Sequence, residues 1–278
     1  MVNVENEYAP AELLGPGGAL WLDKVAAFEG VAAAFSTKKT LEEGPAAGFE
    51  GAVLDEEGRI NEEYVARLCA TVGFPYGRLS SCHQVHGTEI CRVVVAERRW
   101  LGACDGLATD LSNAPLAVFT ADCVPIVLWG ARAGALAVLH AGWRGTLGKI
   151  AAVGVSRLEA YWQVRPEEIV VFLGPGIGPC CYDVGDDVAR AAEAAFGKKA
   201  GQVLIDEGGV RRLDLYRANE LAAQEAGVLP ENIYRVATCT SCEDELFVSA
   251  RRDGKAAGRL MAVAAIEQAG AGARGDGA

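Results

Sequence analysis

The sequence predicts an α/β (α+β) protein, in which strands and hairpins are interspersed with helices along a single domain. Apolar, partly β-branched segments such as 124–129, 135–140 and 168–173 are predicted strands, and helical spacing of apolar residues follows several of them. Apolar residues make up 51% of the 278 positions, enough for a large core. Because no linker or internal repeat divides the chain, we expect one domain over 20–270 and a disordered tail over 271–278.

Local patterns predict the individual elements. We expect, in chain order, a strand at 31–36, a loop at 41–60, a helix at 61–72, strands within 79–95, the strands 124–129 and 135–140, a helix at 145–162, a strand at 168–173, a helix ending at 196, a hairpin at 203–213, a helix at 214–226, a strand at 232–236 and a final helix at 257–268. Asn61 and Asp214 are expected to cap their helices, and Asp183 or Asp186 to cap the helix that ends at Phe196.

The two strands at the centre of the chain place a cysteine and a histidine together. A hairpin centred on Arg132 sets Val124 opposite His140, with Cys123 beside it. Cross-strand neighbours lie roughly 5 Å apart. The thiol and the imidazole therefore share one site, as metal ligands, as a nucleophile and its base, or as a buried cysteine beside a hydrogen-bonded histidine.

The residues after His140 favour catalysis over packing. Gly142–Gly145 (Gly-Trp-Arg-Gly) directly precede a predicted helix. The free N–H groups of a helix N-terminus, together with Arg144, would attract an anion. A metal ligand or nucleophile beside an anion site is typical of a catalytic centre.

The chain has three histidines in all, and the other two lie within residues 79–87. If this segment is a strand, His83 and His86 point to opposite faces, so only one of them enters a site. His86 shares a polar strand end with Gln84. Asp105, in Cys-Asp-Gly, is either a turn residue or a carboxylate that supports the site.

Two further motifs are weaker indications. Residues 174–182, rich in glycine, form either a phosphate-binding loop or a simple tight loop, since no Gly-Lys-Ser/Thr follows. Cys239 and Cys242 form a C-x-x-C without a second pair or a histidine nearby, which is a weak zinc signal. With nine cysteines and no signal-peptide pattern at the start, we expect reduced thiols and a cytoplasmic protein.

Charge and hydropathy limit the expected partners. The net charge of −11 argues against nucleic acid and anionic membranes as partners, but it leaves room for a small anion held by local cations. The longest apolar region is interrupted by Asp122 and Arg132, so no membrane span is expected. The sequence does not indicate an oligomeric state.

Five motifs together resemble the YfiH-like family, which is also called the laccase-domain or "multicopper polyphenol oxidase" family. They are QVHG at 84–87, TADC at 120–123, HAGWRG at 140–145, GPGIGPCCYDVG at 174–185 and a C-terminal CT…F-x-S-x-RRDG. They occur in the family's order, and the resemblance covers roughly residues 30–268. It implies mixed sheets between helices, similar to the cysteine-hydrolase domain of a bacterial deamidating toxin.

The resemblance also implies a site and an activity. It implies a zinc ion held by His86, Cys123 and His140, and three protein ligands suit a catalytic zinc with an open fourth position. It implies a purine nucleoside phosphorylase that converts adenosine, inosine or methylthioadenosine and phosphate into the base and ribose 1-phosphate, with adenosine deaminase activity as well. A purine nucleoside and phosphate are therefore the expected partners.

Roles follow for the neighbouring residues. Arg144 is expected to hold phosphate, and Asp122, Gln84 or zinc-bound water to assist departure of the base, beside Cys123 and His140 as catalytic residues. Lys38 stands where family members carry an arginine. Its ammonium is a point charge where arginine would bind two oxygens, so phosphate or ribose binding there would differ.

Other functions remain open. In a cysteine hydrolase Cys123 would be the nucleophile and His140 the base, and His86 would not be needed. A metal-stabilised interaction protein is the non-enzymatic reading. A polyphenol oxidase is disfavoured, because multicopper sites are built mostly from histidine and the chain has three histidines without a His-x-His pair.

Overall fold

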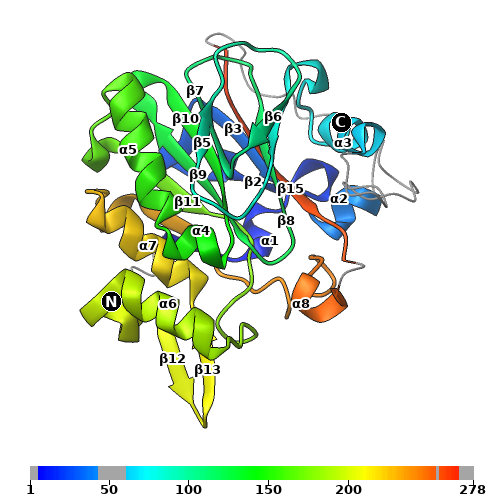
Figure 1. Cartoon of the computed structure of the whole chain (residues 1–278). Helices are drawn as coiled ribbons and strands as arrows, with labels where there is room; N and C mark the ends of the chain where they lie inside the picture. Colours follow the sequence, from blue (N-terminus) through cyan, green and yellow to red (C-terminus); the bar gives the residue numbers. More distant parts are fainter. Residues whose placement is uncertain (1–5, 43–60, 255–256, 269–278) are drawn as a thin grey trace.

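A computed structural model of the chain describes residues 6–42, 61–254 and 257–268. The elements lie in four layers: helices, a seven-stranded sheet, a six-stranded sheet and a second group of helices (Figure 1). The predicted class, mixed sheets flanked by helices, is confirmed. None of the helices in the described part of the chain combines the length and apolar character that crossing a membrane requires.

The seven-stranded sheet contains the central hairpin, and it mixes parallel and antiparallel pairs. Its strands, in spatial order, are β1 (Glu7–Tyr8), β14 (Ile233–Val236), β11 (Val170–Leu173), β9 (Val124–Gly130), β10 (Ala135–Ala141), β7 (Gly106–Thr109) and β5 (Ile90–Arg92). Every residue of β9 and β10 is buried. Helices cover one face of this sheet and the second sheet covers the other, which explains why these strands are apolar at nearly every position.

The six-stranded sheet packs against the inner face of the first. Its strands, in spatial order, are β2 (Leu20–Trp21), β3 (Val31–Phe35), β15 (Leu260–Ile266), β8 (Leu116–Thr120), β4 (Ser80–His83) and β6 (Arg99–Ala103). Alternate residues of the paired strands share the core between the sheets. Leu136 and Val138 of β10 lie in that core, whereas Ala137 and Leu139 face the helices.

Helices close the two outer faces. The helices of the described residues are α1 (Pro10–Leu13), α2 (Lys38–Glu42), α3 (Glu62–Thr71), α4 (Trp143–Leu147), α5 (Ile150–Trp162), α6 (Asp186–Phe196), α7 (Leu215–Glu225) and α8 (Ala250–Asp253), the last of which borders the cavity described below. Helix α5 packs directly on the seven-stranded sheet, α6 and α7 extend the same hydrophobic core, and α3 packs on the six-stranded sheet (Figure 1). The hairpin of β12 (Leu204–Glu207) and β13 (Val210–Leu213) forms a separate two-stranded sheet.

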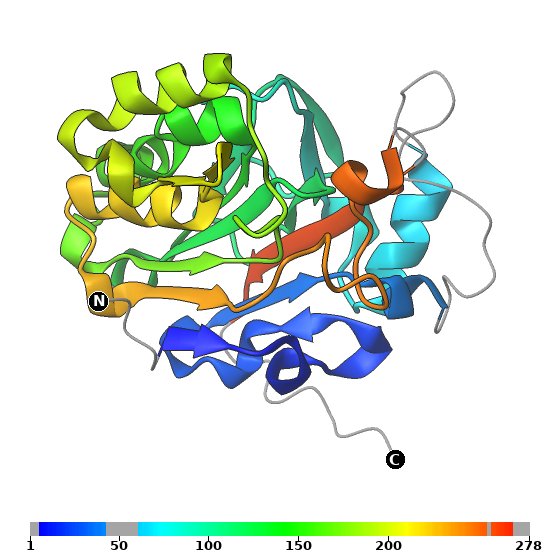
Figure 2. The ribbon, with the colours of Figure 1, turned by 90° about the horizontal axis from the view of Figure 1, so that it is seen from below.

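The C-terminal segment is a strand, so the helix predicted over 257–268 is wrong. Strand β15 lies between β3 and β8 and pairs antiparallel with both (Figure 2). All of its residues are buried, because both faces of the sheet are covered. An apolar segment without a polar face has no periodicity that separates a strand from a helix.

The central hairpin forms as predicted, but its register differs by one residue. His140 pairs with Pro125, and Val124 pairs with Ala141. The connection Ala131–Gly134 has an even number of residues and ends on Gly134 in the left-handed conformation (φ 59°), so Arg132 is not its centre. His140 and Cys123 still come together, because both lie at the open end of the hairpin.

The helix predicted over 145–162 is two helices. Helix α4 begins at Trp143 and α5 at Ile150, and Lys149 between them has a left-handed φ of 61°. The N-cap residue of helix α6 is Gly185, which has no side chain to cap the helix, so the predicted cap by Asp183 or Asp186 is wrong.

The remaining predicted elements are found close to their expected ends. Asn61 caps α3, its side chain accepting a hydrogen bond of 3.1 Å from the Tyr64 N–H, and Asp214 caps α7 in the same way. Helix α2 extends to Glu42, and residues 43–60 and 269–278, with the predicted loop and tail, lie outside the described residues.

Candidate functional site

Three connections that cross from the six-stranded to the seven-stranded sheet carry the candidate site. His86 lies between β4 and β5, Asp105 between β6 and β7, and Cys123 between β8 and β9. His140 is the penultimate residue of β10. Residues far apart in the sequence thus meet where the chain changes sheet.

The ligand atoms of His86, Cys123 and His140 all lie within 4.8 Å of one another. The two imidazole rings are 4.8 Å apart between centroids and nearly perpendicular, at 79°. His140 is buried, whereas His86 is exposed and has a left-handed φ of 61°. Strand β4 ends at His83, so His86 lies in a loop and strand alternation does not decide its direction.

Asp105 is a buried carboxylate that supports both histidines. Of the two roles that the sequence allowed, a turn residue or a supporting carboxylate, the structure shows the second. Its Oδ1 lies 2.8 Å from Nδ1 of His140, and it accepts hydrogen bonds from the backbone N–H groups of Val85, His86 and Gly87. A carboxylate can only accept, so Nδ1 of His140 carries the proton and Nε2 is left to act in the site. Asp105 therefore fixes the His86 loop and the His140 tautomer together.

Cys123 and His140 shift each other's pKa values toward the charged forms. Burial works to raise the pKa of the Cys123 thiol, but the charge and hydrogen bond of His140, with help from His86, lower it to about 6. Burial works to lower the pKa of His140, but the Cys123 thiolate and the Asp105 hydrogen bond raise it to about 9. The two groups thus stabilise each other's charged forms.

The donor set and its surroundings fit a zinc ion. Two imidazoles and one thiolate are the ligand types of a catalytic zinc with an open fourth position, and Asp105 supplies the outer hydrogen bond that such histidines usually make. A Cβ atom at Gly142 would lie 2.6 Å from Cδ2 of His86 and 3.1 Å from Sγ of Cys123. Only glycine leaves these ligands room to converge.

A cavity of about 730 Å³ opens beside the three ligands. This volume is within the range of small-molecule sites. Its lining combines the ligands with aromatic and cationic side chains: Cys82, His83, Gln84, His86, Trp100, Leu101, Phe119, Ala121, Asp122, Cys123, His140, Tyr182, Ala250, Arg251 and Arg259. His83 therefore borders the cavity together with His86, although it is not part of the ligand cluster.

Asp122 and Gln84, both predicted site residues, line this cavity but are engaged with the protein. Asp122 has a left-handed φ of 86°, and its two oxygens accept bonds of 2.7 Å from the Thr240 hydroxyl and the Arg251 N–H. The Gln84 amide pairs with both backbone groups of Phe119 at 2.8 Å. Both side chains hold cavity walls in place.

The two predicted phosphate-binding cations lie outside the lining described above. Lys38 donates its Nζ to the Asp244 carbonyl at 2.6 Å. Arg144 is exposed, with its guanidinium 4.3 Å from the centroid of the Trp143 ring. Among the arginines and lysines that the structure describes, Arg251 and Arg259 border the cavity.

Sequence reasoning missed several residues of the cavity wall. Trp100 and Phe119 face one another at 6.3 Å between ring centroids, and Tyr182 lies under the Arg251 guanidinium at 4.9 Å. These residues come from separate elements and share no local spacing. The signals available were the motif positions of Tyr182 and Arg251, which the resemblance contained without assigning them roles.

Fold and site together describe a layered α/β protein with a candidate metal centre open to a cavity. The chain belongs to the family described as "Multi-copper polyphenol oxidoreductase laccase", whose model matches residues 32–267. The expected YfiH-like membership is confirmed by both sequence and structure.

Three relatives illustrate this membership. Purine nucleoside phosphorylase YlmD of Geobacillus stearothermophilus is 38% identical over 205 residues, covering 70% of this chain and 75% of its own; its crystal structure gives a TM-score of 0.79 over 88% of this chain and 94% of that one. Adenosine deaminase RL5, from an unknown prokaryotic organism, is 38% identical over 186 residues, 63% of this chain and 71% of its own. Hypothetical protein YfiH of Bacillus licheniformis gives a TM-score of 0.79 at 29% identity, over 90% of this chain and 96% of that one.

Proposed function

We propose that this chain is a zinc-dependent purine nucleoside phosphorylase. It would convert adenosine, inosine or methylthioadenosine and phosphate into the free base and ribose 1-phosphate, and it would also deaminate adenosine. The observation that carries the proposal is the cavity of about 730 Å³ that joins the three candidate ligands to aromatic and cationic walls. The names of the relatives YlmD and RL5 agree with these two activities.

The walls suit the parts of a nucleoside. The Trp100 and Phe119 rings offer apolar faces for a purine, while Arg251 and Arg259 offer positive charge for phosphate. In phosphorolysis a phosphate oxygen bonds to C1′ of the ribose as the bond from C1′ to the base nitrogen breaks, and the base leaves with that electron pair. We propose that Asp122 or Gln84, at the cavity wall, assists the departing base.

His86, Cys123 and His140 would hold the zinc ion, with Asp105 fixing the orientation of His140. When bound, zinc supplies a Lewis acid and an activated water, the chemistry that replacing an amino group requires. In deamination the C6–N bond of adenosine breaks, water provides the new oxygen, and ammonia leaves.

Three alanine variants test which cationic side chain binds phosphate. We expect Arg259→Ala to raise the KM for phosphate about tenfold or more, as befits a charged contact. If Arg144→Ala or Lys38→Ala also raises the KM for phosphate, the replaced residue keeps its predicted role in phosphate binding. If only Arg259→Ala does so, phosphate lies inside the cavity and those two predictions are wrong.

The reaction is tested by chromatography of metal-analysed protein incubated with adenosine, with and without phosphate. Adenine that forms only with phosphate establishes phosphorolysis, and inosine in both samples establishes deamination. His86→Ala, Cys123→Ala and His140→Ala should each lose the zinc ion of this centre together with turnover, while His83→Ala, on the same cavity wall, should keep both. The absence of both products from zinc-loaded protein would contradict the proposal.

One observation favours a second candidate, a cysteine hydrolase. The Cys123 thiolate, His140 and Asp105 match the arrangement of nucleophile, base and orienting carboxylate that such enzymes use. His86→Ala distinguishes the two, because a hydrolase would retain its activity without the third ligand. A polyphenol oxidase is not supported, since three histidines are too few for a multicopper site.

A further inference from the structure

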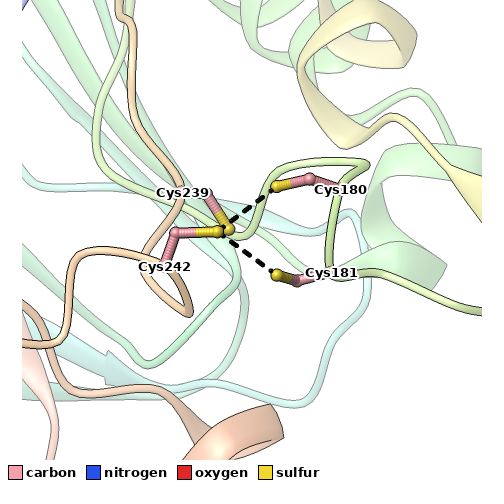
Figure 3. Close-up of side chains that lie close together, drawn as sticks. All are labelled: Cys180, Cys181, Cys239 and Cys242. Carbon is pink, nitrogen blue, oxygen red and sulfur yellow. Dashed lines mark hydrogen bonds between the residues drawn. The ribbon is translucent and has the colours of Figure 1, made fainter.

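Four cysteines gather at a place separate from the His86–Cys123–His140 cluster. Cys180 and Cys181 lie in the loop between β11 and α6, and Cys239 and Cys242 lie in the segment that follows β14 (Figure 3). In the sequence the C-x-x-C motif had no second pair. The fold supplies that pair from about sixty residues earlier in the chain.

The sulfur positions match one tetrahedral metal ion. Sγ of Cys242 lies 3.6 Å from Sγ of Cys180 and 3.4 Å from Sγ of Cys181. All four sulfur atoms lie within 4.8 Å of one another. Ligands about 2.3 Å from a tetrahedral zinc ion are separated from each other by about 3.8 Å. The separations are far longer than a disulfide bond of about 2.05 Å, and all four thiols are free.

The backbone around the cluster is shaped for this approach. A Cβ atom at Gly178 would lie 3.1 Å from Cβ of Cys239 and 3.3 Å from Sγ of Cys180. Glycine therefore lets the two loops approach each other where the sulfurs converge. Cys180 and Cys242 are exposed, so an ion can reach the cluster from solvent.

We propose that Cys180, Cys181, Cys239 and Cys242 bind a second, structural zinc ion. A set of four thiolates selects zinc or iron–sulfur chemistry. Sulfurs this close surround a single ion, whereas a cluster of several irons and sulfides would hold its cysteines farther apart. With four protein ligands the site has no open position for a substrate, which is the pattern of structural zinc.

This ion would fasten one wall of the cavity. Cys181 directly precedes Tyr182, which lines the cavity, and the Cys181 carbonyl accepts a bond of 3.3 Å from Arg251. Thr240, inside the C-x-x-C, donates its hydroxyl to Asp122, the residue before Cys123. The four-cysteine site thus joins two loops that reach the first metal centre through Asp122 and Tyr182.

Metal analysis of the purified full-length chain tests the proposal. Wild-type protein should hold about two equivalents of zinc, and Cys242→Ser and His86→Ala about one each, because each variant loses a ligand of one site. Cys91→Ser, which removes a thiol outside both clusters, should still hold about two. All four cysteines lie outside the helices and strands, so loss of this ion in Cys242→Ser should leave the far-ultraviolet circular dichroism spectrum unchanged.

Cobalt substitution gives a second readout that does not depend on activity. In the Cys123→Ala variant the first centre has no thiolate. Intense thiolate-to-cobalt absorption of this variant can therefore come only from the four-cysteine site. That absorption should vanish in the Cys123→Ala/Cys242→Ser double variant. Two results would overturn the proposal. One is a wild-type protein that holds a single zinc ion and loses it in the His86→Ala variant. The other is a protein mass lowered by the hydrogens that the four cysteines lose when they form disulfides.

Discussion

At the residue scale, the site depends on one buried carboxylate. The Asp105 oxygens accept hydrogen bonds from His140 and from the backbone at Val85, His86 and Gly87. Burial acts against the charge, but these bonds hold the pKa of Asp105 below its ordinary value. One side chain thus organises both histidines of the candidate metal centre.

We expect Asp105→Asn to weaken zinc binding about 10- to 100-fold, the usual effect of losing such a supporting group. An amide has only one oxygen, so its NH₂ group faces two N–H donors whichever way it turns. Zinc titration against a chromophoric chelator measures the effect. Asp110→Asn, at an exposed carboxylate, is the control, and equal affinities in the two variants would contradict the role of Asp105.

The Cys123–His140 pair predicts a pH dependence of zinc affinity. Between the pKa of Cys123, about 6, and that of His140, about 9, the metal-free pair is thiolate and imidazolium. His140 must lose its extra proton to bind zinc, so each zinc ion that binds releases one proton. The apparent affinity of the site for zinc therefore rises about tenfold per pH unit in this window.

Chelator competition at several pH values checks this slope, with the Cys242→Ser variant used so that the first centre is measured alone. Calorimetry in buffers of different ionisation enthalpy counts the released proton. An affinity that stays constant from pH 6 to 9 would show that the pair is not ionised in this way.

At the scale of elements, local sequence patterns predicted correctly those helices and strands that have one end or one face in solvent. The caps at Asn61 and Asp214 were correctly predicted because a side chain and a backbone N–H three residues later decide them. Strand β15 was missed because its partners β3 and β8 are far away in the sequence. The break at Lys149 was also missed, since a left-handed lysine has no local signature.

The Asn61 cap provides a test of this scale. We expect Asn61→Ala to lower the free energy of unfolding by about 1 kcal/mol, because the Tyr64 N–H loses its acceptor. Urea denaturation measures the change. Asn61→Asp keeps an acceptor oxygen and should remain close to wild type, and zinc content should be the same in both variants.

At the scale of the whole molecule, aromatic contacts join the two sheets. Phe172 of β11 is fully buried and packs on Phe35 of β3, with ring centroids 5.7 Å apart, and edge-on against Phe28 at 6.0 Å. The site lies where the chain crosses between these sheets. Their packing therefore determines how far apart the candidate ligands lie.

We expect Phe172→Ala to cost about 3–5 kcal/mol of stability, because the cavity it leaves lies between two rigid sheets. The urea midpoint should fall clearly, and Phe172→Leu, which fills much of the same space, should fall less. If both variants unfold at the wild-type midpoint, this contact does not hold the sheets together.

The sequence by itself determined the chemical groups and most of the elements. The motifs at His86, Cys123 and His140 identified the candidate ligands, and apolar periodicity located the hairpins and the amphipathic helices. These signals are local or are contained in short motifs, so they are readable without coordinates.

Only the tertiary structure decided the hairpin register, the role of Asp105, the cationic wall of Arg251 and Arg259, and the meeting of two cysteine pairs. Each depends on residues brought together from distant parts of the chain. Burial on both sides removes the polar pattern that sequence reasoning needs, and contacts between loops depend on how the two sheets pack. Long-range packing, rather than local preference, therefore places the second cysteine pair and the cavity wall.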